Sequence, residues 1–180
     1  MLIDLAATAK VFHTPTGIAY ADLTIDGHRE TWPVRGPRVR AWLRRGYYEA
    51  TRNVPSAPAL NAAVNLLEAQ AQFDGPELSV HVRVAEHDGH IYLDLADNTW
   101  RAIEIRPDGW RMVEEPPVRF RRPAGLLPLP EPEQGGSIEA LATLLNLPNH
   151  DFVLVASWCL CRCNQVVGGF GTKIFRPHYG

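Results

Sequence analysis

Arginine side chains interspersed with aromatic residues form the part of this sequence best suited to binding chemistry. Between positions 35 and 48, five arginines alternate with three aromatic residues: Arg35, Arg38, Arg40, Trp42, Arg44, Arg45, Tyr47 and Tyr48. Guanidinium groups bind phosphates and aromatic rings stack on unpaired bases, so this composition indicates contact with nucleic acid. The alternative is an amphipathic helix whose arginines are solvated and whose aromatic rings lie in the core. Trp42 favours that alternative, because it lies on the apolar side of the expected helix.

A second basic cluster lies near position 120. Arg119 and Arg121 would share one face of an extended strand, opposite to Phe120, and Arg122 follows them. Three arginines of the preceding strands lie close by in sequence: Arg101, Arg106 and Arg111. The acidic residues among them are expected to pair with some of these arginines, and surface pairs say little about function: Glu104, Glu114 and Glu115. The predicted nucleic-acid-binding residues are therefore Arg35, Arg38, Arg40, Arg44, Arg45, Arg119, Arg121 and Arg122.

Carboxylates and histidines do not form a convincing catalytic or metal site. A primase-like metal pair needs two acids on the same strand face, two residues apart, whereas Asp94 and Asp97 are three apart and would lie on opposite faces. We expect Asp97 to belong to a turn. His81, His87 and His90 cluster around one hairpin, but they lack a cysteine or a fourth ligand nearby. The sequence therefore predicts no metal site.

The C-terminal part contains two further patterns that resemble binding motifs only superficially. Cys159, Cys161 and Cys163 alternate, whereas zinc sites use pairs separated by two residues, and an odd, clustered set is not a disulfide framework. The glycine-rich run at 168–173 ends in Lys173, but a phosphate loop needs glycine before the lysine and Ser or Thr after it. Here Thr172 precedes it and isoleucine follows. We predict no cofactor and no catalytic residue.

Composition limits the remaining possibilities. The chain has 180 residues, a formal net charge of −2 and a hydrophobic fraction of 46%, which is typical of a folded globular protein and excludes a generally basic protein that coats nucleic acid. No apolar run approaches the roughly 18 residues of a membrane span, and the N-terminus does not resemble a signal peptide. We therefore expect a cytoplasmic protein without a membrane partner.

The pattern of turns and apolar residues predicts an α+β fold. Alternating residues around Asp26-Gly27 predict a hairpin, and two amphipathic helices are expected at residues 37–51 and 57–72. A four- or five-stranded antiparallel meander is predicted at residues 80–120, with turns at Asp88-Gly89 and Asp108-Gly109. Ser137 is expected to cap a helix that ends at residue 145, and another helix begins near residue 151.

The predicted domain organisation follows these elements. We expect an N-terminal α+β lobe at residues 1–76, a meander lobe at 77–122 and a Pro-rich linker at 123–136. A helical segment at 137–161 and an atypical tail at 162–180 complete the chain. The tail has no acidic residue and no clear periodicity.

Several short blocks, taken in order, resemble one protein family: His28-Arg29-Glu30-Thr31-Trp32-Pro33, Tyr47-Tyr48-Glu49, Ile91-Tyr92-Leu93-Asp94-Leu95, Trp100-Arg101-Ala102-Ile103-Glu104-Ile105, Gly109-Trp110, Pro116-Pro117-Val118-Arg119-Phe120-Arg121-Arg122 and Leu127-Pro128-Leu129-Pro130. Together, residues 14–158 resemble the N-terminal portion of bacterial and phage ATP-binding proteins related to phage and plasmid primase-helicases. In that family a phosphate loop and an ATPase core follow. This chain departs from the family after Ser157-Trp158-Cys159-Leu160, so the resemblance implies a relative truncated before the phosphate loop.

The functional expectation rests on this resemblance. It implies a non-catalytic segment of a helicase-like ATPase, not itself an enzyme, that contacts DNA or docks a motor domain. One alternative is a protein-interaction or oligomerisation module that uses exposed apolar side chains such as Phe152, Trp158 and Phe170. Another is a truncated gene remnant, of phage or mobile-element origin, without a present function.

Overall fold

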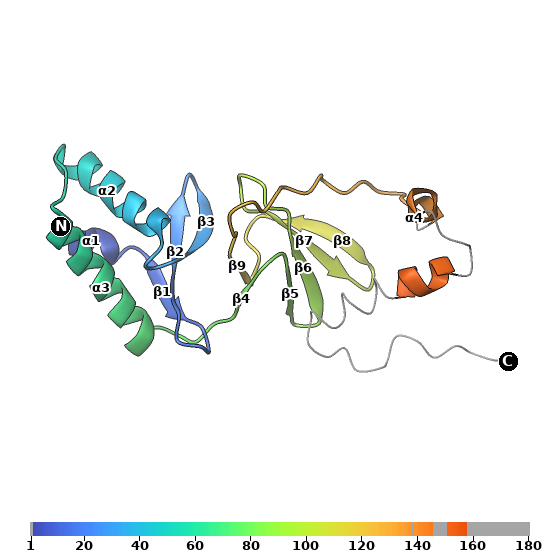
Figure 1. Ribbon diagram of the computed structural model, residues 1–180, viewed down its shortest axis with the longest axis horizontal. Coiled ribbons are helices and arrows are strands. Elements are labelled where there is room, and N and C mark those ends of the chain that lie inside the picture. The colour runs from blue at the N-terminus through green and yellow to red at the C-terminus, as the bar shows by residue number, and fades with distance from the viewer. Residues whose placement is uncertain (1, 138, 146–150, 158–180) are drawn as a thin grey trace.

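The computed structural model describes residues 2–137, 139–145 and 151–157, and its fold is mixed α+β. A three-stranded sheet with its helices forms one end of the molecule, and a four-stranded sheet lies between it and the short C-terminal helices at the other end (Figure 1). Two short strands lie between the two sheets. The predicted fold class is confirmed.

The N-terminal sheet is antiparallel with the order β1-β2-β3. It comprises β1 (Lys10–His13), β2 (Ala19–Ile25) and β3 (His28–Pro33), preceded by α1 (Leu2–Ala6). Asp26 and Gly27 form the β2–β3 turn with φ values of 48° and 84°. A type I′ turn, with positive φ at both residues, matches the twist of the two strands, and Asp-Gly is one of the residue pairs that favour it. The predicted hairpin is confirmed.

Two helices cover one face of this sheet: α2 (Pro37–Thr51) and α3 (Ala57–Phe73). Ser56 caps α3, because its Oγ accepts a hydrogen bond from the backbone N–H of Ala59 at 3.3 Å. Apolar side chains of the sheet and both helices form the main core: Ala21, Leu23, Val39, Leu43, Leu60, Val64 and Leu67. The two helices are therefore where the apolar periodicity predicted them.

Gly46 lies inside α2, where a glycine costs about 1 kcal/mol relative to alanine. The structure gives the reason for its presence. A Cβ at this position would lie 2.6 Å from Cδ2 of Leu5, so the glycine lets α1 approach α2 closely.

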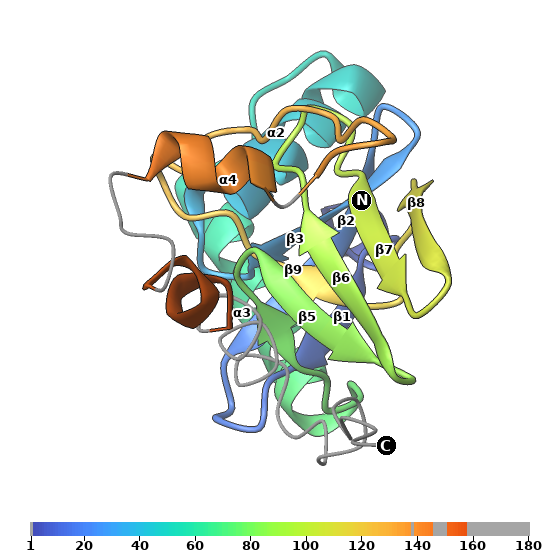
Figure 2. The ribbon, with the colours of Figure 1, turned by 90° about the vertical axis from the view of Figure 1, so that its right-hand side faces the viewer.

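The second sheet is an antiparallel meander with the order β5-β6-β7-β8, which Figure 2 shows nearly face-on. Its strands are β5 (Val84–His87), β6 (His90–Asp94), β7 (Ala102–Arg106) and β8 (Gly109–Val113). Asp88 and Gly89 form the first turn with φ values of 51° and 76°, as the sequence predicts.

The first and last strands of the predicted meander are not part of the four-stranded sheet. β4 (Val80–His81) and β9 (Arg119–Phe120) form a separate parallel pair, so residues 118–120 are not a fifth antiparallel strand. Arg83 adopts a φ of 70°, which no continuous strand allows, and this separates β4 from β5. The Arg83 guanidinium donates to the carbonyl oxygens of Asp94 at 3.1 Å and Leu127 at 2.7 Å, which holds the break in place.

The Pro-rich segment after β9 lies along the meander. The backbone N–H of Leu129 donates to the carbonyl oxygen of Leu95 at 2.8 Å, and Glu131 accepts a hydrogen bond from Arg101. α4 (Glu139–Leu144) and a helical segment at residues 151–157 follow. No helix in the described ranges has the length and apolar character needed to cross a bilayer.

Polar contacts join the N-terminal sheet to β9 and to the residues just before it. Arg29 of β3 donates to the carbonyl oxygens of Pro116 and, at 2.9 Å, of Val118. Asp22 of β2 is buried, accepts a hydrogen bond from Thr31 at 2.6 Å and pairs with Arg119 at 3.2 Å. Burial lowers the pKa of Arg29, and the nearby Asp22 carboxylate opposes this shift. These contacts hold the N-terminal sheet against β9 and the residues that precede it.

Candidate functional site

Helix α2 carries four of the eight predicted binding residues, and its ends are well defined. Pro37 occupies the first turn, where its missing N–H is not needed. Arg52 ends the helix in a left-handed conformation with φ 59°, and its N–H donates to the carbonyl oxygen of Tyr48. Val39 and Leu43 face the core and set the rotation of the helix. This rotation decides which arginines face solvent.

Five exposed residues lie on the side of α2 opposite the core, the last of them at the end of the helix: Ala41, Arg44, Arg45, Tyr48 and Arg52. Counted from Ala41, they follow at three, four, seven and eleven positions, which places them on one side of a helix. We call these residues the outward face. Tyr48 is 51% exposed, and the Arg52 guanidinium lies 5.8 Å from the centre of its ring. The outward face thus places one accessible aromatic ring among three arginines. The sequence prediction named Tyr48 but left Arg52 out, because the C-cap geometry that positions Arg52 is not visible in a residue pattern.

The five arginines predicted at residues 35–45 divide into two groups. Arg35 pairs with Glu68 of α3 at 2.6 Å, Arg38 pairs with Glu30 of β3 at 3.2 Å and Arg40 donates to Asn61 of α3 at 2.9 Å. Arg38 and Arg40 thus tie α2 to β3 and α3, and Arg35 ties the segment just before α2 to α3.

Arg44 and Arg45 belong to the outward face. Arg44 is exposed, and its side chain has no partner among the residues that the structure describes. Arg45 pairs with Glu49 at 2.9 Å, and both side chains are more than half exposed. That hydrogen bond raises the pKa of Arg45.

The second predicted cluster is mostly internal. Arg122 holds Asp94 through two hydrogen bonds of 3.0 and 2.6 Å, and its guanidinium lies 4.1 Å from the ring centre of Trp100. Arg119 binds Asp22, as described above, and lies over Phe12. Arg121 is exposed and has no side-chain partner in the described part of the chain. The structure therefore gives Arg119 and Arg122 different buried carboxylate partners and leaves Arg121 facing solvent.

Asp94 and Asp97 do not lie on opposite faces of one strand, because β6 ends at Asp94. Both carboxylates approach the Arg122 guanidinium, at 2.6 Å for Asp94 and 4.0 Å for Asp97. The turn predicted for Asp97 agrees with its hydrogen bonds to the backbone and side chain of Arg101. Burial acts to raise the pKa of Asp97, but these hydrogen bonds outweigh it and lower the pKa. The two carboxylates serve as acceptors for arginine in this structure.

A buried carboxylate on β7 organises the other charges of the meander. Glu104 accepts hydrogen bonds from Tyr92 at 2.8 Å, from Arg106 at 2.8 Å and from Arg111. Burial acts to raise the pKa of Glu104, but its donors, with Arg111 first, lower it to about 2. Burial, together with the Glu104 bond, raises the pKa of Tyr92 to about 12. The predicted pairing of Glu104 with nearby arginines is confirmed.

The predicted histidine cluster does not converge. His87 and His90 face each other across the hairpin, but His90 binds Glu104 at 3.0 Å and His87 lies beside Asp88. His81 lies in β4, where burial lowers its pKa. No group of three or more potential metal ligands occurs among the described residues. The cysteines and the glycine-rich run at 168–173 lie outside those residues.

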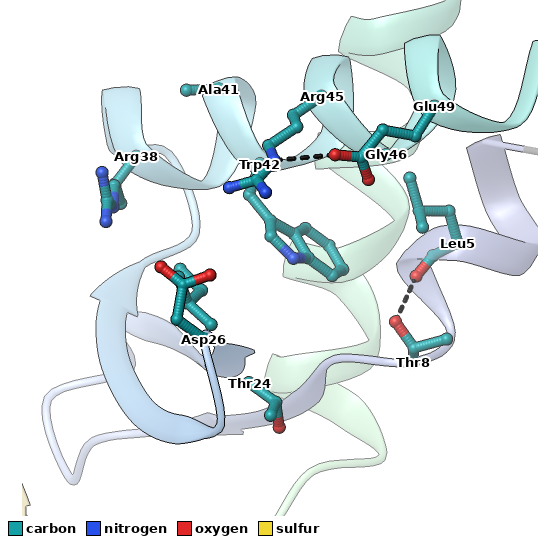
Figure 3. Close-up of a pocket in the computed structure, with 11 residues that line it drawn as sticks. Leu5, Thr8, Thr24, Asp26, Arg38, Ala41, Trp42, Arg45, Gly46 and Glu49 are labelled. Atoms are coloured by element: carbon teal, nitrogen blue, oxygen red, sulfur yellow. Dashed lines mark hydrogen bonds and ion pairs between the residues drawn. The ribbon is translucent and has the colours of Figure 1, made fainter. Parts of the chain in front are cut away.

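A pocket of about 540 Å³ opens beneath α2, between the β2–β3 hairpin and α1 (Figure 3). The indole ring of Trp42 points into the space between Asp26 and Leu5. This pocket was not predicted from the sequence, because its walls come from three separate elements of the chain. Its lining comprises Leu5, Thr8, Thr24, Ile25, Asp26, Arg38, Ala41, Trp42, Arg45, Gly46 and Glu49.

Comparison with known proteins adds no further constraint. The chain matched no protein-family model, no curated protein sequence and no solved structure. The resemblance to the region that precedes an ATPase core therefore stays a prediction.

Proposed function

We propose that this chain is a non-catalytic module that contacts DNA through the outward face of α2. The observation that carries the proposal is the exposed Tyr48 ring with Arg44, Arg45 and Arg52 around it. Guanidinium groups beside an accessible aromatic ring suit a single strand, because phosphates bind the cations while a base stacks on the ring.

The charge distribution supports the same surface. Helix α2 carries four arginines and one glutamate, although the whole chain has a net charge of −2. The carboxylates that neutralise Arg35 and Arg38 lie away from the outward face, on α3 and β3. Glu49 is the acidic partner on α2 itself, and its exposed pair with Arg45 is worth about 1 kcal/mol or less. A phosphate can therefore replace Glu49 at little cost.

The resemblance to primase-helicase relatives supports a role beside a motor domain. On this proposal the module holds a DNA strand for a helicase-like ATPase and hydrolyses nothing itself. Magnesium-dependent ATP hydrolysis by the purified 180-residue chain would contradict the non-catalytic part of the proposal.

Fluorescence anisotropy with a labelled single-stranded oligonucleotide tests the DNA contact. If about three phosphates are neutralised, log K should fall with log salt at a slope of about −2. Arg44→Gln should reduce the magnitude of this slope by roughly 0.7, and Tyr48→Ala should weaken binding about 5-fold or more, through lost stacking. Tyr48→Phe keeps the ring and should bind like the wild type.

Arg121→Gln is the matched control, because Arg121 is an exposed arginine on the other lobe. We expect its affinity and salt slope to match those of the wild type. An equal loss in Arg44→Gln and Arg121→Gln would contradict the assignment to α2. Absence of any salt-dependent binding at low ionic strength would overturn the proposal as a whole.

The C-terminal helices favour a second candidate function, protein interaction. Leu144, Val153 and Leu154 are 81%, 62% and 67% exposed, whereas Phe152 is partly covered. Trp158 and Phe170, which the sequence also indicated, lie outside the described residues. Self-association that is insensitive to salt in sedimentation, without affinity for DNA, would favour this function over the first.

A further inference from the structure

The pocket beneath α2 adjoins the outward face. Arg45 belongs to both, since it is exposed on α2 and also lines the pocket mouth (Figure 3). A strand whose phosphates lie along the outward face would therefore have its bases next to this opening. We propose that the pocket receives one unpaired nucleobase of that strand. This inference rests on the proposed function and names the part of the ligand that the pocket binds.

The charge of the lining favours a neutral ligand. Arg38 and Arg45 are balanced by Asp26 and Glu49, so the formal charges of the lining sum to zero. Arg38 is also bound to Glu30, outside the pocket. A phosphate or a simple cation gains no net attraction there. A neutral ring does not depend on a net charge for its binding, and it can both donate hydrogen bonds to the carboxylates and accept them from the arginines.

The walls of the pocket suit a planar ring. Trp42 packs against the core and also lines the pocket, so it offers an anchored stacking surface. Leu5 and Ile25 add apolar contact. The volume of about 540 Å³ falls within the usual range for small-ligand sites, roughly 300–1,000 Å³. Aromatic stacking on a base is worth about 1–3 kcal/mol, or about 5- to 100-fold in affinity.

The polar groups of the pocket supply hydrogen bonds to a base edge. Asp26 and Thr24 are exposed, and neither side chain forms a hydrogen bond with a residue that the structure describes. A carboxylate only accepts, so Asp26 favours cytosine, whose exocyclic amino group offers two N–H donors, over unpaired thymine, which offers only its N3–H. The Thr8 hydroxyl donates to the carbonyl oxygen of Leu5 at 2.7 Å and retains lone pairs that can accept.

Two oligonucleotides of equal length test the pocket in the Tyr48→Ala variant, in which no base can stack on the outward face: one of deoxycytidines and one with abasic sugars along the same number of phosphates. Anisotropy titrations should show the abasic strand binding about 5- to 100-fold more weakly. If neither strand binds, the proposed function fails. If both strands bind equally, the DNA contact stands and the base pocket is overturned.

Asp26→Asn tests the hydrogen bond without disturbing the fold, because asparagine also tolerates the left-handed turn position. The wild type should prefer deoxycytidine over thymidine oligonucleotides, and Asp26→Asn should lose this preference. Asp88→Asn is the matched control, since Asp88-Gly89 is the corresponding turn of the second sheet and lies outside the pocket lining. A preference unchanged in Asp26→Asn, or lost in both variants, would contradict the role of Asp26.

Discussion

Arg122 provides the sharpest test of how this chain uses arginine. Its side chain is 12% exposed and holds the Asp94 carboxylate, which is 1% exposed, through two hydrogen bonds. It also lies 4.1 Å from the ring centre of Trp100, which contacts Trp32 of β3 edge-to-face. The sequence placed Arg122 among the DNA-binding residues. The structure instead predicts that its replacement by methionine destabilises the fold.

The size of the destabilisation depends mainly on the Asp94 carboxylate, which the substitution leaves without its partner. Arg122→Met would leave Asp94 buried without its cation, and removing one partner of a buried pair costs about 3–5 kcal/mol. The lost contact with Trp100 adds about 0.5–2 kcal/mol. Methionine regains part of this through its own packing, so we expect the free energy of unfolding to fall by about 4 kcal/mol. That is a large fraction of the roughly 5–15 kcal/mol that stabilises a typical domain.

Urea unfolding followed by circular dichroism measures this change. Arg122→Lys should recover only part of the loss, because lysine cannot make two parallel hydrogen bonds and stack at the same time. The double variant Asp94→Leu/Arg122→Met should be more stable than Arg122→Met, since no buried charge remains unpaired. Arg121→Met, the exposed neighbour, should stay within about 0.5 kcal/mol of the wild type. An equally small change in Arg122→Met would refute the reasoning.

Two further predictions concern stability. The folded pKa of Glu104, about 2, lies below its ordinary value of 4.5, so the stabilisation is complete above pH 4.5 and is lost as the pH falls through the folded value. Because Arg111 is 61% exposed and water screens its pair with Glu104, we expect the free energy of unfolding in urea to fall by only about 1–2 kcal/mol over this pH range. Glu104→Gln should abolish this pH dependence. Parallel pH profiles for the wild type and the variant would contradict the prediction. Gly75→Ala should cost about 2–3 kcal/mol, because its Cβ would lie 2.7 Å from the carbonyl oxygen of Ala71 and 3.0 Å from that of Val11. Gly136→Ala, in open space, should be neutral, and an equal effect of the two substitutions in thermal unfolding would exclude the steric cause.

The local elements of this fold could be predicted because their causes are local. Asp26-Gly27 and Asp88-Gly89 each adopt the left-handed turn that their residue types favour. The helix at residues 37–51 follows from its apolar periodicity and from the proline at its start. Even the break before α3 is set by nearby residues, since Ser56 caps the helix that follows it.

Contacts between distant parts of the chain could not be predicted in the same way. The break at Arg83 depends on carbonyl oxygens of Asp94 and Leu127, eleven and 44 positions away. The parallel pairing of β4 with β9 joins residues 80 and 119. A single residue pattern contains no information on these partners, and for the same reason the pocket beneath α2 was not expected.

Buried and exposed arginines therefore have two different roles in this protein, the first structural and the second, on our proposal, in binding DNA. Arg122 and Arg119 are largely covered and bind carboxylates that are themselves buried, so they stabilise the junction between the sheets. Arg45 is 66% exposed and bound only to a surface glutamate, so a phosphate can compete for it. The two uses should be separable by experiment. Substitutions on the outward face should alter affinity for DNA at constant stability, whereas substitutions at Arg122 should lower stability and, in the fraction that remains folded, leave affinity unchanged.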